Sequence, residues 1–432
     1  MAQWRLGAAP PVPTAYGGTT AVALGLGTIG GFGIGLYALG ALAFGWPAAA
    51  YAPLTQAHGQ VQVLGLAGLT IVGVGSLLLP AFWREKLGRP SAVPVGGAIV
   101  GLGLLAQLVG QPLAAGAART VLLMLAAILP IAGFAWAGAE IVRPRLQRRE
   151  RPAAWESLLL IGGVSLVVAL LLRASTLLGL AQTGAAASYG PLHQLTIGLE
   201  LGGFLVAATI GVQLRLLPSL ARTRPVTGWV VWLGIFTLAL AILARAAGTI
   251  LVAPLATEAA NWLSTIAAAS LFLATGLGRR GVPPTVQAPA TLLPGRTRLV
   301  LRVAWAGLLV GEVGRATGWL PADAATHAFT SVYLLPLILV VGFRMLPRVS
   351  TYPVVYPNAC GALIWLGLVG GVLRAFSATL GTPIGWQLAW IGAALLTVVV
   401  LAFVGLAWSP WGVPTAAPRN PNATHLPVVR GA

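Results

Sequence analysis

The sequence contains very few of the residues on which soluble enzymes and secreted domains depend. Only 8% of its 432 residues are charged, eight residues are acidic, and Cys360 is the single cysteine. An ordinary soluble domain has about 25% charged residues, so this composition excludes a soluble globular enzyme and a disordered tail protein. A single cysteine also excludes an internal disulfide and any cysteine-based iron–sulfur or zinc site.

Apolar residues make up most of the chain instead. Hydrophobic residues account for 57% of it, and a membrane-spanning helix needs about 20 of them in succession. We therefore predict an all-α polytopic membrane protein in a lipid bilayer, with 12 transmembrane helices and no sizeable soluble domain. The apolar runs lie at about 20–46, 54–80, 93–114, 119–142, 156–180, 191–217, 227–253, 259–278, 298–319, 322–346, 357–380 and 385–408.

Basic residues are distributed unevenly along the chain. The net charge of +18 is compatible with binding to nucleic acid or anionic lipid, but the basic residues fall in alternate connections. Arginines gather near 84–89, 143–151, 222–224 and 279–298, whereas 47–53 and 182–190 carry no charge. The positive-inside rule then places both termini in the cytoplasm of a bacterial-type inner membrane, with no nucleic-acid partner. We expect a cytoplasmic segment at 1–19, one membrane domain at 20–408 and a cytoplasmic tail at 409–432.

Three of the four histidines recur at a nearly constant spacing. His58, His193 and His327 are separated by 193 − 58 = 135 and 327 − 193 = 134 residues, and each opens an even-numbered span. A proline precedes each histidine, and each of these spans ends in Leu-Pro. The pattern predicts three pseudo-threefold repeats of four helices, at about 20–142, 156–278 and 298–408. The fourth histidine, His425, lies in the tail and receives no role.

The repeated histidines are candidate metal ligands. Neutral imidazole binds haem iron and copper well, and an ionisable side chain at membrane depth usually marks a functional site. The alternative is that histidines near the interface are only solvated or hydrogen-bonded to loops. Because His58, His193 and His327 are in register, we favour metal binding. Three histidines suffice for one bis-histidine haem, or for one haem with a single axial histidine and a copper with two.

Two of these segments resemble a known family. His58-Gly-Gln-Val-Gln-Val-Leu-Gly, running on to Leu-Leu-Leu-Pro80, resembles the second helix of the NnrS family, as does Thr326-His-Ala-Phe-Thr-Ser-Val-Tyr, running to Phe343-Arg-Met-Leu-Pro347. The resemblance covers roughly 20–408 and implies twelve spans, haem (of b type) and copper, and a role in the response to nitric oxide and nitrosative stress.

The arrangement of helices is also similar to that of the catalytic subunit of haem–copper oxidases and nitric oxide reductases. Those enzymes carry two histidines close together on helix ten and a copper-binding cluster on helices six and seven. This chain has only His327 and His193 at the corresponding helices, and none on the seventh. We therefore expect neither terminal oxidase nor full nitric oxide reductase activity, but a haem site that binds or senses a small gas or holds a metal.

Arginines occur near the outer ends of four odd-numbered spans, where charge is expensive. They suggest a clamp for haem propionates or for a small anion such as nitrite, since guanidinium pairs with carboxylates in a bidentate manner. The alternative is snorkelling to the interface, helped by a helix C-terminus. For one of them, Arg315, a local ion pair with Glu312 is the simpler interpretation. The four are Arg173, Arg245, Arg315 and Arg374.

Glu200 follows His193 by seven residues, which places it on nearly the same helix face about 10 Å deeper. It is either a proton relay or a buried partner for an arginine on a neighbouring helix. Gln107 and Gln111 occupy the third span, as polar lining or as contacts between helices.

The leading functional expectation is an NnrS-like haem-binding membrane protein involved in nitric oxide handling, with copper as a second candidate metal. Two alternatives remain open at this point. One is a secondary transporter of a small anion, which the buried arginines suit. The other is an accessory or assembly subunit of a respiratory oxidase complex.

Overall fold

The computed structural model describes residues 14–47, 50–226, 228–279, 294–349 and 357–408. Within these ranges the chain is helical and contains no β-strand. Its elements join into twelve continuous helical runs, and each predicted apolar run falls on one of them. The runs are α1–η1–α2 (Thr14–Leu26, Gly27–Gly33, Ile34–Phe44), α3–η2–α4 (Tyr51–Gln60, Val61–Gly68, Leu69–Trp83), α5 (Ala92–Gly110), α6 (Ala117–Leu146), α7 (Ala154–Thr183), α8–η3–α9 (Pro191–Gly198, Leu199–Leu205, Val206–Leu220), α10 (Trp229–Ile250), α11 (Pro254–Thr275), α12 (Pro294–Ala316), α13–η4–α14 (Ala322–His327, Ala328–Leu334, Leu335–Val349), α15–η5 (Pro357–Phe376, Ser377–Leu380) and α16 (Pro383–Trp408).

Ten of the described helices are long and apolar enough to cross a membrane, so the protein is an all-α polytopic membrane protein. The two runs outside this set are α11 and α12. Helix α12 carries Arg298, Arg302, Glu312 and Arg315 along its length, which lowers its hydropathy although Trp305 at its middle is fully buried. That all twelve runs cross the membrane remains a prediction.

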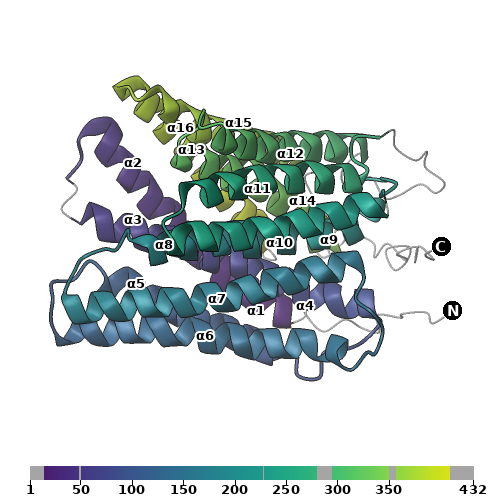
Figure 1. Cartoon of the computed structure of the whole chain (residues 1–432), viewed down its shortest axis with the longest axis horizontal. Helices are drawn as coiled ribbons and strands as arrows, with labels where there is room; N and C mark the ends of the chain where they lie inside the picture. Colours follow the sequence, from purple (N-terminus) through teal and green to yellow (C-terminus); the bar gives the residue numbers. More distant parts are fainter. Residues whose placement is uncertain (1–13, 48–49, 227, 280–293, 350–356, 409–432) are drawn as a thin grey trace, which may run out of the picture.

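The second, sixth and tenth runs form the interior of the bundle. Their apolar windows are 78%, 72% and 78% buried, whereas those of the other candidate spans are 33% to 56% buried. The runs lie roughly parallel to the long axis of the molecule (Figure 1). The three helical runs that carry the repeated histidines are therefore the ones that the others surround.

These inner runs share an unusual local geometry. Segments η2, η3 and η4 are π-helical and follow His58, His193 and His327 in their respective runs, and η1 interrupts the first run in the same way. In a π-helix the backbone hydrogen bonds join residues five apart in the sequence instead of four. Such segments are rare and are frequent at functional sites. In each inner run the π-helical segment therefore lies next to the histidine that the sequence repeat identifies.

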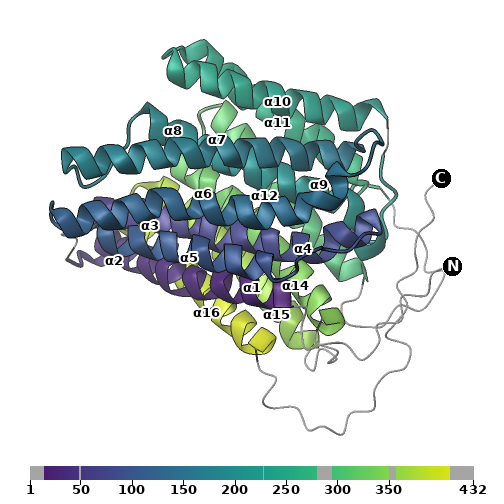
Figure 2. The same cartoon turned by 90° about the horizontal axis from the view of Figure 1, so that it is seen from below.

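The outer runs close around the interior. Helix α6 packs on α7, α11 packs on α12, and α16 at the end of the chain packs on α2 and η1 near its beginning. The view in Figure 2 shows α16 beside the first run and α10 with α11 on the opposite side. Successive runs alternate in direction, so Thr14 and Trp408 lie at the same end, which we call the termini end. We call the other end, with connections 45–50, 111–116 and 184–190, the loop end.

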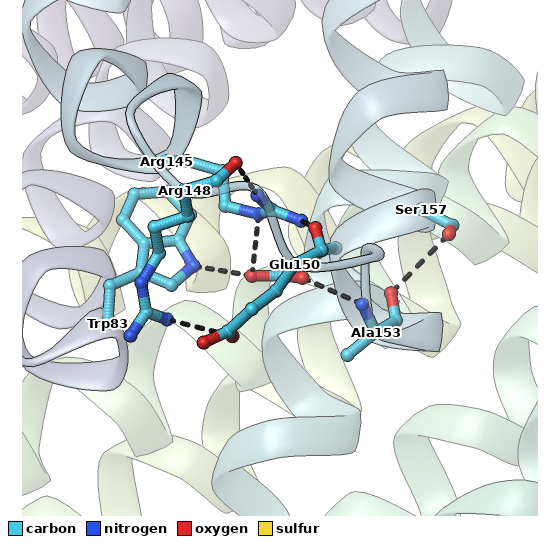
Figure 3. A network of polar contacts seen from close by, with 7 residues as sticks. Trp83, Arg145, Arg148, Glu150, Ala153 and Ser157 are labelled. Atoms are coloured by element: carbon cyan, nitrogen blue, oxygen red, sulfur yellow. Dashed lines mark hydrogen bonds and ion pairs between the residues drawn. The ribbon is translucent and has the colours of Figure 1, made fainter.

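A polar network joins α4, α6 and α7 at the termini end (Figure 3). Glu156 accepts hydrogen bonds from Trp83 Nε1 at 2.6 Å and the Ala153 backbone at 2.7 Å, and its Oε1 lies 3.1 Å from Arg145 Nε. Its side chain is only 11% exposed, whereas that of nearby Glu150, 3.8 Å from Arg148, is 76% exposed. The buried carboxylate therefore holds three segments together.

Several expectations concern residues outside the described ranges. They include most of the cytoplasmic segment 1–19, the tail 409–432 with His425, and part of the basic connection after α11.

Replacing Glu156 by glutamine should lower the free energy of unfolding by about 1–3 kcal/mol. Trp83 and Ala153 each donate to a different oxygen of Glu156, so in either orientation the amide NH₂ of glutamine faces one of these two donors. The Glu150→Gln control should change it by less than about 1 kcal/mol, as an exposed pair contributes little. Thermal unfolding in detergent measures both variants. Equal effects would contradict this account of the network.

Candidate functional site

The three repeated histidines lie toward the loop end of the inner runs, but their rings have different partners. His58 is in α3, His193 is in α8, and His327 is the last residue of α13. A neutral imidazole carries one N–H and one lone pair, so the partner of one nitrogen decides what the other can do. The contacts of each ring therefore decide whether it is available to a metal.

The ring of His58 is held against the first helical run. Its Nδ1 lies 2.7 Å from the carbonyl oxygen of Gly31, and a carbonyl only accepts, so Nδ1–H is the donor. The ring fits because the neighbouring residues lack side chains: a β-carbon at Gly35 would lie 2.6 Å from Cε1 of the imidazole. In its neutral form His58 therefore keeps its lone pair on Nε2.

His327 has the same arrangement with different partners. Its Nδ1 lies 2.9 Å from the backbone oxygen of Asp323 and 3.3 Å from Oδ1 of the same residue. Arg374 from α15 holds that carboxylate with two contacts, of 3.1 and 3.4 Å. A histidine that binds a metal usually donates its other ring N–H to a backbone carbonyl or a carboxylate, which fixes the tautomer and the ring orientation. Nε2 of His327 is again the free nitrogen.

These two rings belong to one region of the bundle. His58 lies within electrostatic range of both His327 and Arg374. Within the described residues neither Nε2 atom has a hydrogen-bond partner. The structure thus brings together two of the three predicted ligands and one of the four predicted arginines.

His193 has the opposite arrangement. Its Nδ1 lies 3.1 Å from the amide nitrogen of Gln56, which also donates to the Ser188 carbonyl at 2.6 Å. The amide oxygen of Gln56 accepts from the Ser188 backbone N–H and from Gln111 Nε2, so the amide orientation is fixed. The Nε2 of His193 lies 3.4 Å from the same amide nitrogen, so Nδ1 is the nearer of the two ring nitrogens. We therefore assign Nδ1 as the acceptor and the proton to Nε2.

A small polar cavity lies next to His193. Its lining comes from the second, third, fifth and sixth runs, and its free space is about that of one water molecule. The lining residues are Gln56, Gln60, Gln107, Arg173, Thr176, Leu177, His193 and Thr196.

Arg173 and Glu200 are the buried charged groups of this region, with 3% and 0% exposure. Arg173 donates to the Ala126 carbonyl at 2.7 Å and to Gln107 at 2.5 Å, while Glu200 Oε2 accepts from Gln60 at 3.0 Å. The two charges interact through space without a direct ion pair. Gln107, placed by the sequence in the third span, is thus part of the polar lining.

The four arginines do not form one clamp. Arg173 belongs to the cavity and Arg374 to the His327 region. Arg245 donates to Asn261 at 3.1 Å and lies within electrostatic range of Arg315 and Glu312. Within the described part of the chain, the expected ion pair between Glu312 and Arg315 is not formed, and each side chain keeps one buried polar atom without a partner.

The donor set fits a haem better than a copper centre. Haem iron takes neutral imidazole at its axial positions, and His58 and His327 each present a free Nε2. In the described ranges no group of three or more His, Cys, Asp or Glu side chains is placed to bind a metal ion. Haem binding and copper binding both stay predictions.

Comparison with known proteins does not identify a family for this chain. No protein-family model matches the chain, and no curated protein matches it.

The sequence reasoning missed three important residues, Gln56, Gln60 and Asp323. Gln56 and Gln60 flank His58 at two residues on either side, so they point away from it toward the sixth run. Asp323 precedes His327 by four residues, the helical spacing for a direct contact. That spacing, in a chain with eight acidic residues, was a signal for a histidine partner.

We expect ¹⁵N NMR of histidine-labelled protein at neutral to mildly alkaline pH to show two tautomers. His58 and His327 should carry their proton on Nδ1 and His193 on Nε2, because their partners accept in the first case and donate in the second. With only four histidines in the chain, single His→Gln variants assign the signals. The same tautomer at His58 and His193 would contradict the assignment.

Proposed function

We propose that this protein is an integral membrane haem protein in which His58 and His327 would hold the haem iron. The observation that carries the proposal is the matched bonding of these rings, each donating from Nδ1 and keeping Nε2 free. They come from the second and tenth runs and lie within electrostatic range of each other. A bis-histidine haem of b type supplies reversible one-electron chemistry when bound.

Arg374 has the chemistry to neutralise a haem propionate in this proposal. It is only 11% exposed, it lies within electrostatic range of His58, and it already holds one carboxylate, that of Asp323. Guanidinium presents several donors in a fixed fork, so it serves a second carboxylate as well as the first. Asp323 in turn orients His327, so one arginine supports both the ligand and the cofactor.

We further propose that the protein acts in nitric oxide handling, as the resemblance of the His58 and His327 segments to the NnrS family implies. A haem held here would supply the chemistry that binds nitric oxide. Of the two histidines, His327 is the less firmly held, since its side chain is 21% exposed and its Nδ1 partners belong to its own helix. His58 is anchored on a different run, through Gly31.

The proposed architecture is three four-helix units related by a pseudo-threefold axis. Its support is the shared order of histidine, π-helical segment and Leu-Pro in the second, sixth and tenth runs. The contacts of α6 with α7, of α11 with α12 and of α16 with α2 join successive units in the same way.

The proposed orientation places the termini end in the cytoplasm. Arg84, Arg148 and Arg224 lie in connections at this end, whereas connections 45–50 and 184–190 at the other end carry no charge. In the bacterial inner membrane such an asymmetry fixes topology.

The optical spectrum of the purified protein and of three histidine variants tests the proposal. His58→Ala and His327→Ala should each retain less than about a tenth of the wild-type haem. Losing a group that only orients a metal ligand already lowers metal affinity by about 10- to 100-fold, and losing the ligand itself costs at least as much. His193→Ala is the matched control and should keep its haem, because His193 Nδ1 is bonded to Gln56. Wild-type protein without a Soret band or iron, or haem loss only in His193→Ala, would refute it.

A further inference from the structure

The cavity beside His193 lies against a set of polar atoms that have no partner. Among the described residues, Oε1 of Glu200, Oε1 of Gln60 and Nε of Arg173 are buried and make no hydrogen bond. Leaving such groups unpaired destabilises the folded state, so native proteins satisfy them, often with ordered water. Arg173 and Gln60 both line the cavity, one as a donor and the other as an acceptor.

The cavity has the size and polarity that a bound water requires. It has room for about one water molecule, and a buried water needs two to four polar partners. The lining offers such a water the unpartnered Arg173 Nε–H as a donor, the unpartnered Gln60 Oε1 as an acceptor, and the ring of His193. The unpaired atoms and the free space thus have one common explanation.

Glu200 is connected to the cavity through Gln60. Gln60 lines the cavity and also donates to Glu200 Oε2 at 3.0 Å, so the carboxyl group is one hydrogen bond away from a lining residue. Arg173 acts on Glu200 electrostatically without forming an ion pair with it. A direct buried ion pair holds a carboxylate in its ionised form. Arg173 stabilises the charge of Glu200 only from a longer distance.

The charged and titratable groups on the elements packed around η3 are few. Arg173 comes from α7 and His193 from α8, and the Arg245 side chain from α10 passes beside Gly198. Of these groups, Arg173 acts on the Glu200 carboxyl.

Polar groups that line the cavity lead from Glu200 toward the loop end. Thr196 lies one turn away on that side and lines the cavity, followed by His193 and the Gln56 contact with Ser188. On the termini side the apolar side chains of Leu201, Phe204 and Leu205 belong to the main hydrophobic core, and they offer a proton no hydrogen-bond partner. The nearest buried hydroxyls on that side are those of Ser165, beside Gly203, and Thr209.

We propose that Glu200, Gln60, Arg173 and a water in this cavity form a proton-binding site that communicates with the loop end of the bundle past His193. In release, the O–H bond of the protonated Glu200 carboxyl breaks and its proton goes to the cavity water, which passes a proton on toward the loop end. The carboxylate left behind is balanced by Arg173. Uptake is the reverse, so atoms and charge balance without any redox partner.

Infrared difference spectroscopy of the purified full-length protein detects this site independently of haem. Wild-type protein should show a pH-dependent C=O band of a buried carboxylic acid that shifts in D₂O. Glu200→Gln should remove the band, Glu200→Asp should move it, and the control Glu312→Gln should leave it unchanged. Absence of the band in wild-type protein, or its persistence in Glu200→Gln, overturns the proposal.

The rate at which that band exchanges in D₂O tests the direction of access. Thr196→Val should slow exchange by about five- to tenfold, because one hydrogen-bonding group is lost from the route. Thr209→Val is the matched control on the termini side of Glu200, where Thr209 donates to the Leu205 carbonyl, and it should leave the rate unchanged. Slowing in Thr209→Val, or equal rates in both variants, refutes access from the loop end.

Discussion

A polar side chain inside an apolar helical bundle must find a partner, and this constraint decides what each histidine of the protein can do. His58 and His327 give their Nδ1 proton to backbone oxygens, whereas His193 accepts a hydrogen bond from Gln56. The three positions are equivalent in sequence, yet the first two are left with a free lone pair at Nε2 and the third with an N–H. The chemistry of the site follows from this difference.

The difference divides the loop half of the bundle into two regions. One contains His58, His327 and Arg374, where nitrogen lone pairs and a guanidinium suit a metal cofactor that carries carboxylates. The other contains His193, Arg173 and Glu200 around a polar cavity, where donors and acceptors suit water and protons. Both regions border the second run, since His58 faces the first run while Gln56 and Gln60 face the sixth.

Much of the fold was predictable from the sequence because lipid permits few backbone structures. An apolar run long enough to span the bilayer must be helical, so the positions of the helical runs followed from hydropathy alone. The charges on α12 show where this reasoning is weakest: Arg298 and Arg302 donate to carbonyls at the end of α11, and no periodicity reveals such a contact. The π-helical segments were also not predicted, because they depend on packing between runs.

The candidate site was predictable only as a set of residues. The spacing of the histidines pointed to His58, His193 and His327, but the sequence treated them as equivalent and placed four arginines in one clamp. Which ring donates and which accepts depends on Gly31, Asp323 and Gln56, two of which lie on other helices than the ring they contact. Gly31 and Gln56 are tertiary partners, which a single sequence does not reveal, whereas Asp323 lies one turn before His327 on the same helix. The arginines do not form one clamp for the same reason, since Arg173, Arg245 and Arg374 each bond to a different residue, and those partners are tertiary contacts.

The central claim is that His58 of the second run and His327 of the tenth run bind one iron. Electron paramagnetic resonance of the oxidised, purified protein measures this most directly, because a ferric haem with two imidazole ligands is low-spin. The account predicts a low-spin ferric signal in wild-type protein that is unaltered when His193 is replaced by alanine. A high-spin ferric signal in wild-type protein, or a low-spin signal that disappears in His193→Ala, would contradict it.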